Sequence, residues 1–258
     1  MSFTHAVAPE LPYLRRYARA ITGSQALGDA AVREALEAIL AAPEEFNTQG
    51  PARLELYRVF HKIWQPETLG LLNGNDNLPQ ISSRARQALL LTAVEGFSLK
   101  QTAEILTADA DDLASDLQSA KSVMADSLKS KVMVIEDEAI IALHIQSIVK
   151  SVGHDVVGVA RTHSEAVKMA HDTQPELVLA DISLADGSSG IDAVKEILED
   201  IDVPVIFVTA FPERLLTGER PEPTYLITKP FEPIMLTATI AQALLSDREN
   251  KSAISQAA

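Results

Sequence analysis

The sequence predicts two architectures in one chain, an all-α N-terminal half and a C-terminal α/β domain built on a parallel sheet. Residues 1–128 carry apolar side chains at helical spacing and no strand pattern. Residues 129–248 alternate short apolar runs of strand length with amphipathic segments of helix length, the pattern that a parallel sheet requires. A chain of 258 residues is long enough for two domains with separate cores.

Residues 1–66 are expected to form three helices whose apolar stripes are mostly core. The helices are expected from Leu11 to Ile21, ending at Thr22-Gly23-Ser24; through Val32 and Leu40, stopping near Pro43; and from after Gly50-Pro51 to Trp64. Residues 67–77 are rich in Gly and Asn, which indicates a linker between two helical domains.

Residues 78–128 have the pattern of a helix-turn-helix. After an apolar helix, Glu95-Gly96-Phe97 is expected to turn the chain. Ser98 then begins the next helix in a capping box with Gln101, in which each side chain bonds the other residue's backbone N–H. A last helix is expected to begin at Asp109, with acidic residues in its first turn.

Four apolar runs in the second half end on chemically functional side chains. The runs and their ends are Val134-Ile135 with Glu136-Asp137, Leu177–Ala180 with Asp181, Val205–Val208 with Thr209, and Leu226–Thr228 with Lys229. Ligands of such sheets bind outside the carboxyl ends of the strands, so we expect these side chains to share one crevice. Two carboxylates ~4 Å apart repel by about 4 kcal/mol at an effective dielectric of ~20. A hard divalent cation such as Mg2+ relieves this repulsion, and the pattern indicates a phosphoryl switch.

The order, spacing and identity of these residues resemble the receiver domain of two-component response regulators over residues 129–248. The resemblance implies a flavodoxin-like, doubly wound domain with a five-stranded parallel sheet and a cis Lys229-Pro230 peptide. It also implies phosphorylation by a sensor histidine kinase or a phosphotransfer protein. The implied roles are Asp181 as phosphoacceptor; Glu136, Asp137, Asp181 and the Ser183 carbonyl as Mg2+ ligands; and Thr209 and Lys229 as phosphoryl contacts.

Two features depart from the receiver pattern. The aromatic residue usually found three residues before the lysine is Leu226 here, and the adjacent Tyr225 is expected on the other side of the strand. Residues 211–223 contain three prolines and a glycine, so the fourth helix of the domain should be short or irregular. Residues 249–258 are expected to form a flexible tail.

The helical half resembles extracytoplasmic-function sigma factors. Leu89–Ser98 with Gln101–Leu106 is similar to their region 4, and residues 10–64 are similar, more weakly, to region 2. A sigma-like half placed before a receiver is the layout of PhyR-type general stress response regulators of alphaproteobacteria. This resemblance implies that the helical half mimics a sigma factor, binds a NepR-type anti-sigma factor and so releases a stress sigma factor. It also implies that the receiver masks the helical half until Asp181 is phosphorylated.

DNA binding is not expected, because the residues that would contact phosphates are missing. The net charge is −14, and residues 99–126 carry two lysines against six acids. Ala114, Asp116 and Ser119 stand where sigma factors commonly place basic residues. Helix capping and the helix dipole do not explain Asp116, which is expected in mid-helix.

Two alternatives remain open at this stage. The first is a DNA-binding transcription factor or working sigma factor gated by the receiver. The second is a phosphate sink whose helical half docks to a kinase. The chain has no cysteine, no signal-peptide pattern at its N-terminus and no apolar stretch of ~18 residues. We therefore expect a cytoplasmic monomer with no membrane contact, and no enzyme activity beyond assisting its own phosphorylation.

Overall fold

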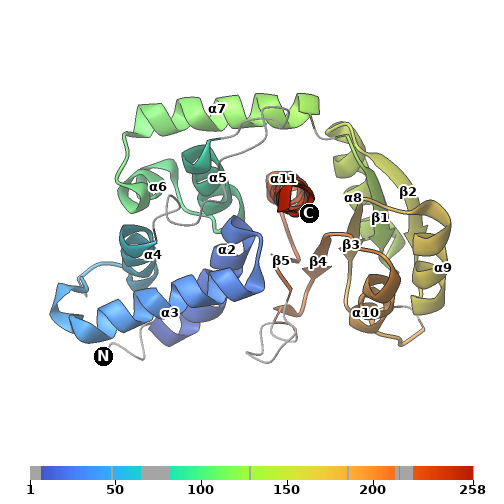
Figure 1. Cartoon of the computed structure of the whole chain (residues 1–258), viewed down its shortest axis with the longest axis horizontal. Helices are drawn as coiled ribbons and strands as arrows, with labels where there is room; N and C mark the ends of the chain where they lie inside the picture. Colours follow the sequence, from blue (N-terminus) through green and yellow to red (C-terminus); the bar gives the residue numbers. More distant parts are fainter. Residues whose placement is uncertain are drawn as a thin grey trace. The chain divides into compact units, whose positions relative to one another are not determined.

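The computed structural model describes residues 7–47, 49–64, 82–127, 129–184, 186–212, 215 and 223–257. The chain divides into two compact units, the first made of Met1–Val123 and Ser255–Ala258 and the second of Met124–Ile254, and each is described by itself (Figure 1). The linker expected at residues 67–77 lies outside the described residues. Among the helices described, none is both long and apolar enough to span a membrane.

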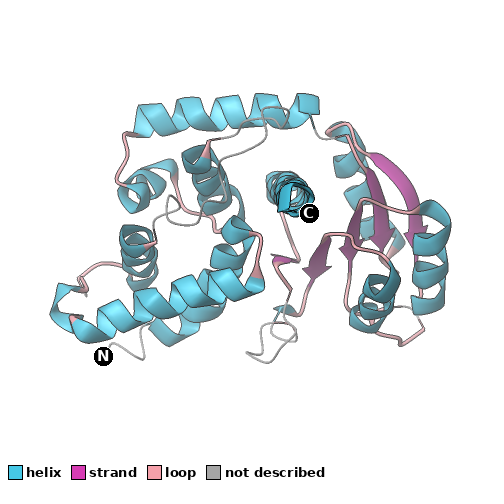
Figure 2. Ribbon diagram, viewed as in Figure 1, coloured by secondary structure: helices cyan, strands magenta, loops and turns pink. Residues whose placement is uncertain are grey.

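The regular secondary structure described in the first unit is helical throughout, which confirms the all-α prediction (Figure 2). Its elements are η1 Ala8–Glu10, α2 Leu11–Thr22, α3 Gln25–Ala41, η2 Pro43–Glu45, α4 Ala52–Ile63, α5 Ser83–Leu89, the π-helical η4 Leu90–Val94, α6 Leu99–Leu106 and α7 Ala110–Ser127. The part that resembles region 4 consists of the helical run ending in η4, a turn, α6, a second turn and α7, which carries the positions of a recognition helix.

Local signals place the helix ends. Gly23 adopts a left-handed conformation (φ 63°) that ends α2, and Ser24 then caps α3 by accepting a backbone hydrogen bond. Ser98 and Gln101 form the expected capping box at the start of α6. Asp109 caps α7, because its Oδ1 accepts hydrogen bonds from two backbone N–H groups of the first turn.

The core of the first unit takes its side chains from the helices that the sequence predicted, although not always from the predicted positions. Its most deeply buried side chains are Leu14, Tyr17, Leu56, Tyr57, Phe60, Leu90, Leu91, Ile105 and Leu113. Leu40 is an exception, because 70% of it is exposed at the end of α3. Aromatic rings dominate one part of the core, where Tyr57 packs edge-on against Phe97 at a centroid distance of 5.0 Å.

The second unit is a five-stranded parallel sheet with strand order β2-β1-β3-β4-β5, as predicted. Its elements are β1 Lys131–Ile135, α8 Ala139–Ser151, β2 Asp155–Ala160, α9 His163–Thr173, β3 Leu177–Ala180, α10 Gly190–Asp200, β4 Val205–Thr209, β5 Tyr225–Thr228 and α11 Pro233–Ala257. Helices α9 and α10 cover one face, and α8 and α11 cover the other (Figure 2). This order reverses between β1 and β3, the point at which such sheets bind ligands.

Leu226 belongs to the core between the sheet and the helices α9 and α10. It is 2% exposed and packs in one buried cluster with Phe207 of β4 and Leu215. Tyr225 is buried outside this cluster, which agrees with its expected place on the other side of the strand. An aliphatic side chain therefore fills the position at which receivers usually carry an aromatic ring.

The residues expected to form a flexible tail, 249–258, are helical as far as Ala257. Helix α11 continues to Ala257, because no glycine or proline interrupts the chain after Pro233. The expectation of an irregular helix within residues 211–223 falls mostly outside the described residues.

Candidate functional site

The strands of the second unit deliver the predicted side chains to one edge of the sheet. Glu136 and Asp137 directly follow β1, and Asp181 directly follows the adjacent strand β3. Thr209 is the last residue of β4, and Lys229 directly follows β5. Since all five strands run in the same direction, their carboxyl ends lie at the same edge.

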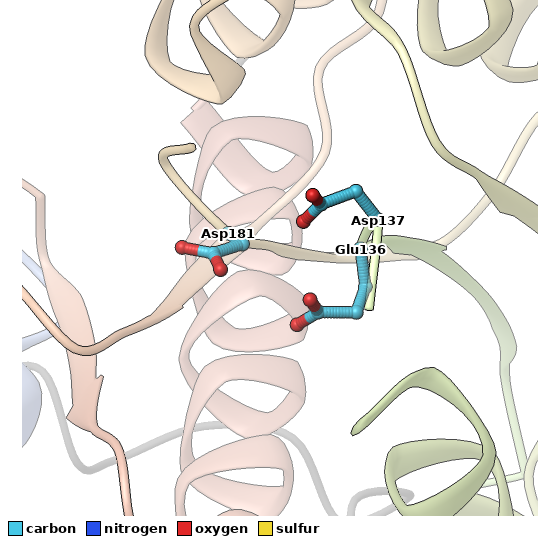
Figure 3. A group of neighbouring side chains, drawn as sticks. All are labelled: Glu136, Asp137 and Asp181. Atoms are coloured by element: carbon cyan, nitrogen blue, oxygen red, sulfur yellow. The ribbon is translucent and has the colours of Figure 1, made fainter. Parts of the chain in front are cut away.

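Three acidic side chains converge at the strand-order reversal. Glu136, Asp137 and Asp181 each offer a carboxylate oxygen, and these oxygens all lie within 4.8 Å of one another. Figure 3 shows the three carboxylates facing a common space. Glu136 and Asp181 are buried, whereas Asp137 is half-buried. The geometry agrees with what the strand ends predicted.

Lys229 neutralises two of these acids. Its Nζ donates hydrogen bonds to Oε2 of Glu136 at 2.7 Å and to Oδ2 of Asp181 at 2.6 Å. Its backbone is held by a hydrogen bond from Lys229 N to the carbonyl of Thr209, at 2.8 Å. The Lys229-Pro230 peptide is cis, as the resemblance to receivers implied.

Burial and charge shift two titrating groups of the cluster. Burial, assisted by the charge of Asp181, raises the pKa of the Glu136 carboxyl, although Lys229 acts in the opposite direction. Burial acts to lower the pKa of the Lys229 amine, but its hydrogen bonds to Asp181 and Glu136 outweigh it and raise that pKa. The amine is therefore a permanent cation beside two carboxylates.

The carboxylate of Asp181 is oriented by its own backbone surroundings. Its Oδ1 accepts a hydrogen bond from the N–H of Ile182 at 2.6 Å. The backbone passes close to Gly190, where an added Cβ would lie 1.8 Å from the carbonyl oxygen of Asp181. Only glycine leaves room for this approach, so Gly190 positions the acid. A glycine in the first turn of a helix, after the capping Ser189, was the available sequence signal.

Thr209 and Ser183 meet the cluster through their backbones, because the carbonyl of Thr209 accepts from Lys229 N at 2.8 Å and the N–H of Ser183 donates to Oδ1 of Asp181 at 3.5 Å. Thr209 is fully buried, and its hydroxyl accepts from the N–H of Phe211 at 3.2 Å. This hydroxyl makes no hydrogen bond to the three acids or to Lys229, all of which are described. Ser183 forms an isolated backbone bridge with Ser189.

Arg161 is a site neighbour that sequence reasoning missed. It follows β2, the strand beside β1, and its Nη2 donates to the carbonyl of Asp137 at 3.0 Å. A basic residue at the end of a strand next to β1 was a weak signal, because the adjacency of β1 and β2 was needed to interpret it.

The donor set fits Mg2+. Proteins hold Mg2+, a small and hard divalent cation, with a few carboxylates together with carbonyls, waters and phosphate oxygens. The acid cluster offers three carboxylates in reach of one another, and the ammonium of Lys229 already occupies part of the space between two of them. The three carboxylates are therefore a suitable set of ligands for such an ion.

Asp116 of α7 has a structural partner in the first unit. Its Oδ2 accepts a hydrogen bond from Nε of Arg84 at 2.6 Å, which joins α7 to α5. The sequence offered no explanation for an acid at this position, because the pair spans 32 residues.

Family models match nearly the whole chain. A model described as the sigma2 domain of PhyR matches residues 7–61, and one described as the sigma-like domain of the response regulator PhyR matches residues 78–126. A response regulator receiver domain model matches residues 132–241.

Curated proteins and solved structures give similar results. The phyllosphere-induced regulator PhyR of Methylorubrum extorquens is 45% identical over 256 residues, 95% of each chain. The crystal structure of the anti-anti-sigma factor PhyR from Bartonella quintana is 49% identical, with a TM-score of 0.89, over 98% of this chain and 100% of that one. A co-crystal structure of PhyR with the anti-sigma factor NepR from Bartonella quintana is 50% identical, with a TM-score of 0.42, over 95% of this chain and 99% of that one.

Proposed function

This chain belongs to the PhyR family of response regulators, and from that premise we propose that it is a phosphorylation-activated partner switch. Its sigma-like half would bind an anti-sigma factor and so release the sigma factor that this partner holds. The proposed units are residues 1–66 and 78–128 as the two sigma-like modules, joined by residues 67–77, and residues 129–248 as the receiver.

Asp181 is the proposed phosphoacceptor. The phosphorus–nitrogen bond of the donor's phosphohistidine breaks, a phosphorus–oxygen bond forms to a carboxylate oxygen of Asp181, and the donor imidazole leaves with the electron pair. The observation that supports this role is the meeting of Glu136, Asp137, Asp181 and Lys229 where the strand order reverses.

The surrounding residues have separate proposed roles. Glu136, Asp137, Asp181 and the carbonyl of Ser183 would hold Mg2+. When bound, Mg2+ offsets negative charge on the transferred phosphoryl group. Lys229 would donate a hydrogen bond to a phosphoryl oxygen in place of one of its present bonds to a carboxylate. Thr209, at the end of β4, would supply a hydroxyl to another phosphoryl oxygen. The phosphodonor is proposed to be a sensor histidine kinase or a phosphotransfer protein.

The anti-sigma partner is proposed from the family. The Bartonella quintana relative is described as an anti-anti-sigma factor, and it has been solved in complex with the anti-sigma factor NepR. A NepR-type protein is accordingly the proposed partner of this chain. The net charge of −14 and the acidic first turn of α7 favour a protein partner over DNA.

Calorimetry of the full-length protein with a NepR-type anti-sigma factor tests the proposal. Beryllium fluoride serves as the phosphoryl mimic, and binding is measured with and without it in the presence of Mg2+. We expect the mimic to tighten binding by about 5- to 150-fold, the usual range of an allosteric coupling. Equal affinity in both states would show that the receiver does not control the sigma-like half. A protein that binds promoter DNA and no anti-sigma factor would be a gated transcription factor instead.

A further inference from the structure

A buried ionic cluster joins the two sigma-like modules at the turn between η4 and α6. Its centre is Glu95, which follows η4 and is 3% exposed. Its Oε1 accepts from Nη2 and Nε of Arg16, at 2.9 Å and 3.2 Å. Its Oε2 accepts from Nη2 of Arg53 and from the hydroxyl of Tyr57, each at 2.9 Å. Arg53 also donates to the carbonyl of Glu95 at 2.9 Å.

All three partners come from the other module. Arg16 lies on α2, and Arg53 and Tyr57 lie on α4, between 38 and 79 residues before Glu95. Arg16 is 6% exposed and Tyr57 is fully buried, so most of the cluster is out of solvent. Burial acts to lower the pKa of both arginines, but it is outweighed: Glu95 raises the pKa of Arg16, and Tyr57 together with Glu95 raises the pKa of Arg53.

The backbone of the turn is shaped to deliver this carboxylate. The π-helical η4 closes with a hydrogen bond from Glu95 N to the carbonyl of Leu90, at 3.0 Å. Such widened turns are rare and occur frequently at functional sites. The next aromatic residue of the turn, Phe97, stacks under Arg53, whose guanidinium carbon lies 4.7 Å from the ring centroid. Glu95 and Phe97, at the two ends of the turn, therefore both contact Arg53.

We propose that Glu95 is a positioning residue that fixes the helix-turn-helix to the region 2-like helices. The two modules then act as one preassembled body before and after phosphorylation, and the anti-sigma factor meets a single composite surface. The rigid junction is independent of the proposed function. Only the identity of the binding partner rests on the proposed function.

The strength of the cluster makes its opening during the switch unfavourable. Opening would break five hydrogen bonds to Glu95 at once, and one hydrogen bond to a charged group is worth a net factor of roughly 12 to 160 in an equilibrium constant. Allosteric couplings usually amount to about 5- to 150-fold. The free energy that phosphorylation supplies is thus too small to open the junction. The conformational effect of phosphorylation is therefore expected elsewhere in the protein.

Distances between the modules test this directly in the full chain. The sequence has no cysteine, so spin labels can be attached uniquely at E37C on α3 and E104C on α6, both of which replace exposed residues. Electron–electron double resonance should give one narrow distance distribution. We expect it to stay unchanged when beryllium fluoride, or beryllium fluoride with a NepR-type anti-sigma factor, is added. A shifted main distance in either state would overturn the proposal.

Two variants of the labelled protein test whether the Glu95 cluster causes the narrow distance distribution. Glu95→Gln and the milder Arg53→Met should broaden the distribution and weaken anti-sigma binding about tenfold or more, because a hydrogen-bonded charge loses its partner. Asp29→Asn is the matched control, since Asp29 binds the fully buried Arg19 at 2.8 Å and 2.9 Å within the region 2-like module.

The control should leave the distance distribution narrow. Equal broadening in Asp29→Asn would mean that Glu95 is merely one of several stabilising residues, which overturns its assignment as the junction. If the labelled protein with Glu95 and Arg53 intact does not bind the anti-sigma factor but the distances behave as expected, the proposed function fails and the junction stands.

Discussion

The Nζ of Lys229 lies 2.6 Å from Oδ2 of Asp181, so the proposed phosphoacceptor already holds a cation in the unphosphorylated protein. The same amine lies 2.7 Å from Glu136, and it thereby links the ends of β1, β3 and β5. A phosphoryl group on Asp181 would bring new oxygens that compete for this amine. Redistribution of the lysine's hydrogen bonds is a direct route from the acceptor to the last strand of the sheet.

Phosphorylation should depend on Asp181 and not on acids in general. Asp181→Asn should abolish labelling by radioactive acetyl phosphate, because the amide cannot form the acyl phosphate. Asp186→Asn is the control, since Asp186 is an exposed acid only five positions further along the chain. The control should label normally, and a chelator of Mg2+ should abolish labelling in both proteins that retain Asp181. Persistent labelling of Asp181→Asn would move the acceptor to another residue.

Replacing Lys229 should destabilise the receiver when Mg2+ is absent. Lys229→Met leaves Glu136 and Asp181 facing each other without the ammonium, at an expected loss of about 3 kcal/mol in the free energy of unfolding. Mg2+ should restore part of the loss, because it offsets the same charges. Urea unfolding with and without Mg2+ measures both effects. Lys195→Met removes an exposed pair with Asp192 and should change stability by less than about 0.5 kcal/mol. An equal loss in the two variants would contradict a special role for Lys229.

A methyl group at position 190 should disturb the acceptor without touching its carboxylate. In Gly190→Ala the new Cβ would meet the carbonyl of Asp181, so the backbone must move. We expect a loss of about 1–3 kcal/mol in stability, as for other overpacked sites, together with slower phosphorylation. Gly50→Ala is the matched control, because no atom lies within 4 Å of its added Cβ. Normal labelling of Gly190→Ala would show that the close approach is not required.

The helical half should lose stability as the pH falls below about 6.5. Burial lowers the pKa of His61 to about 3, so the unfolded chain binds a proton in a pH range in which the folded chain does not. This contribution to stability is complete above pH 6.5 and decreases toward pH 3, with a slope of up to about 1.4 kcal/mol per pH unit.

Trp64 provides the measurement for this prediction. It is the only tryptophan in the chain, and its ring centroid lies 5.9 Å from that of His61. Urea unfolding followed by its fluorescence between pH 7 and pH 5 should show the slope. His61→Gln should flatten it, whereas His171→Gln, at a half-exposed position in the receiver, should not. An unchanged slope in His61→Gln would assign the pH dependence to other groups.

The sigma-like half should not bind DNA. Fluorescence anisotropy with a sigma-type promoter fragment at low salt should show no affinity tighter than about 10⁻⁴ M. Asp111→Lys with Asp112→Lys reverses two exposed charges at the start of α7 and should produce weak, salt-sensitive binding. Micromolar binding by the unmodified protein, lost on addition of salt, would contradict the mimicry proposal.

Local patterns in the sequence were enough to predict the fold class and the ends of several helices. Strand length, helix length and capping residues such as Ser98 depend on neighbours a few positions away, and each is visible in the printed chain. The ends of the strands also predicted the acid cluster, because parallel strands bring their carboxyl ends to one edge. The length of helix α11 was underestimated, because the polar composition of its last residues resembles that of a tail.

Long-range contacts were decided by the tertiary structure alone. The amino-acid sequence by itself determined which acids end the strands and where the helix-turn-helix lies. It did not show that Gly190 lies against the carbonyl of Asp181, that Arg84 pairs with Asp116, or that Glu95 gathers two arginines from α2 and α4. These contacts join residues between 9 and 79 positions apart, and their partners are selected by how whole helices pack. The sequence does not show which carboxylate will pair with which guanidinium, because the pairing depends on the packing that excludes water between them.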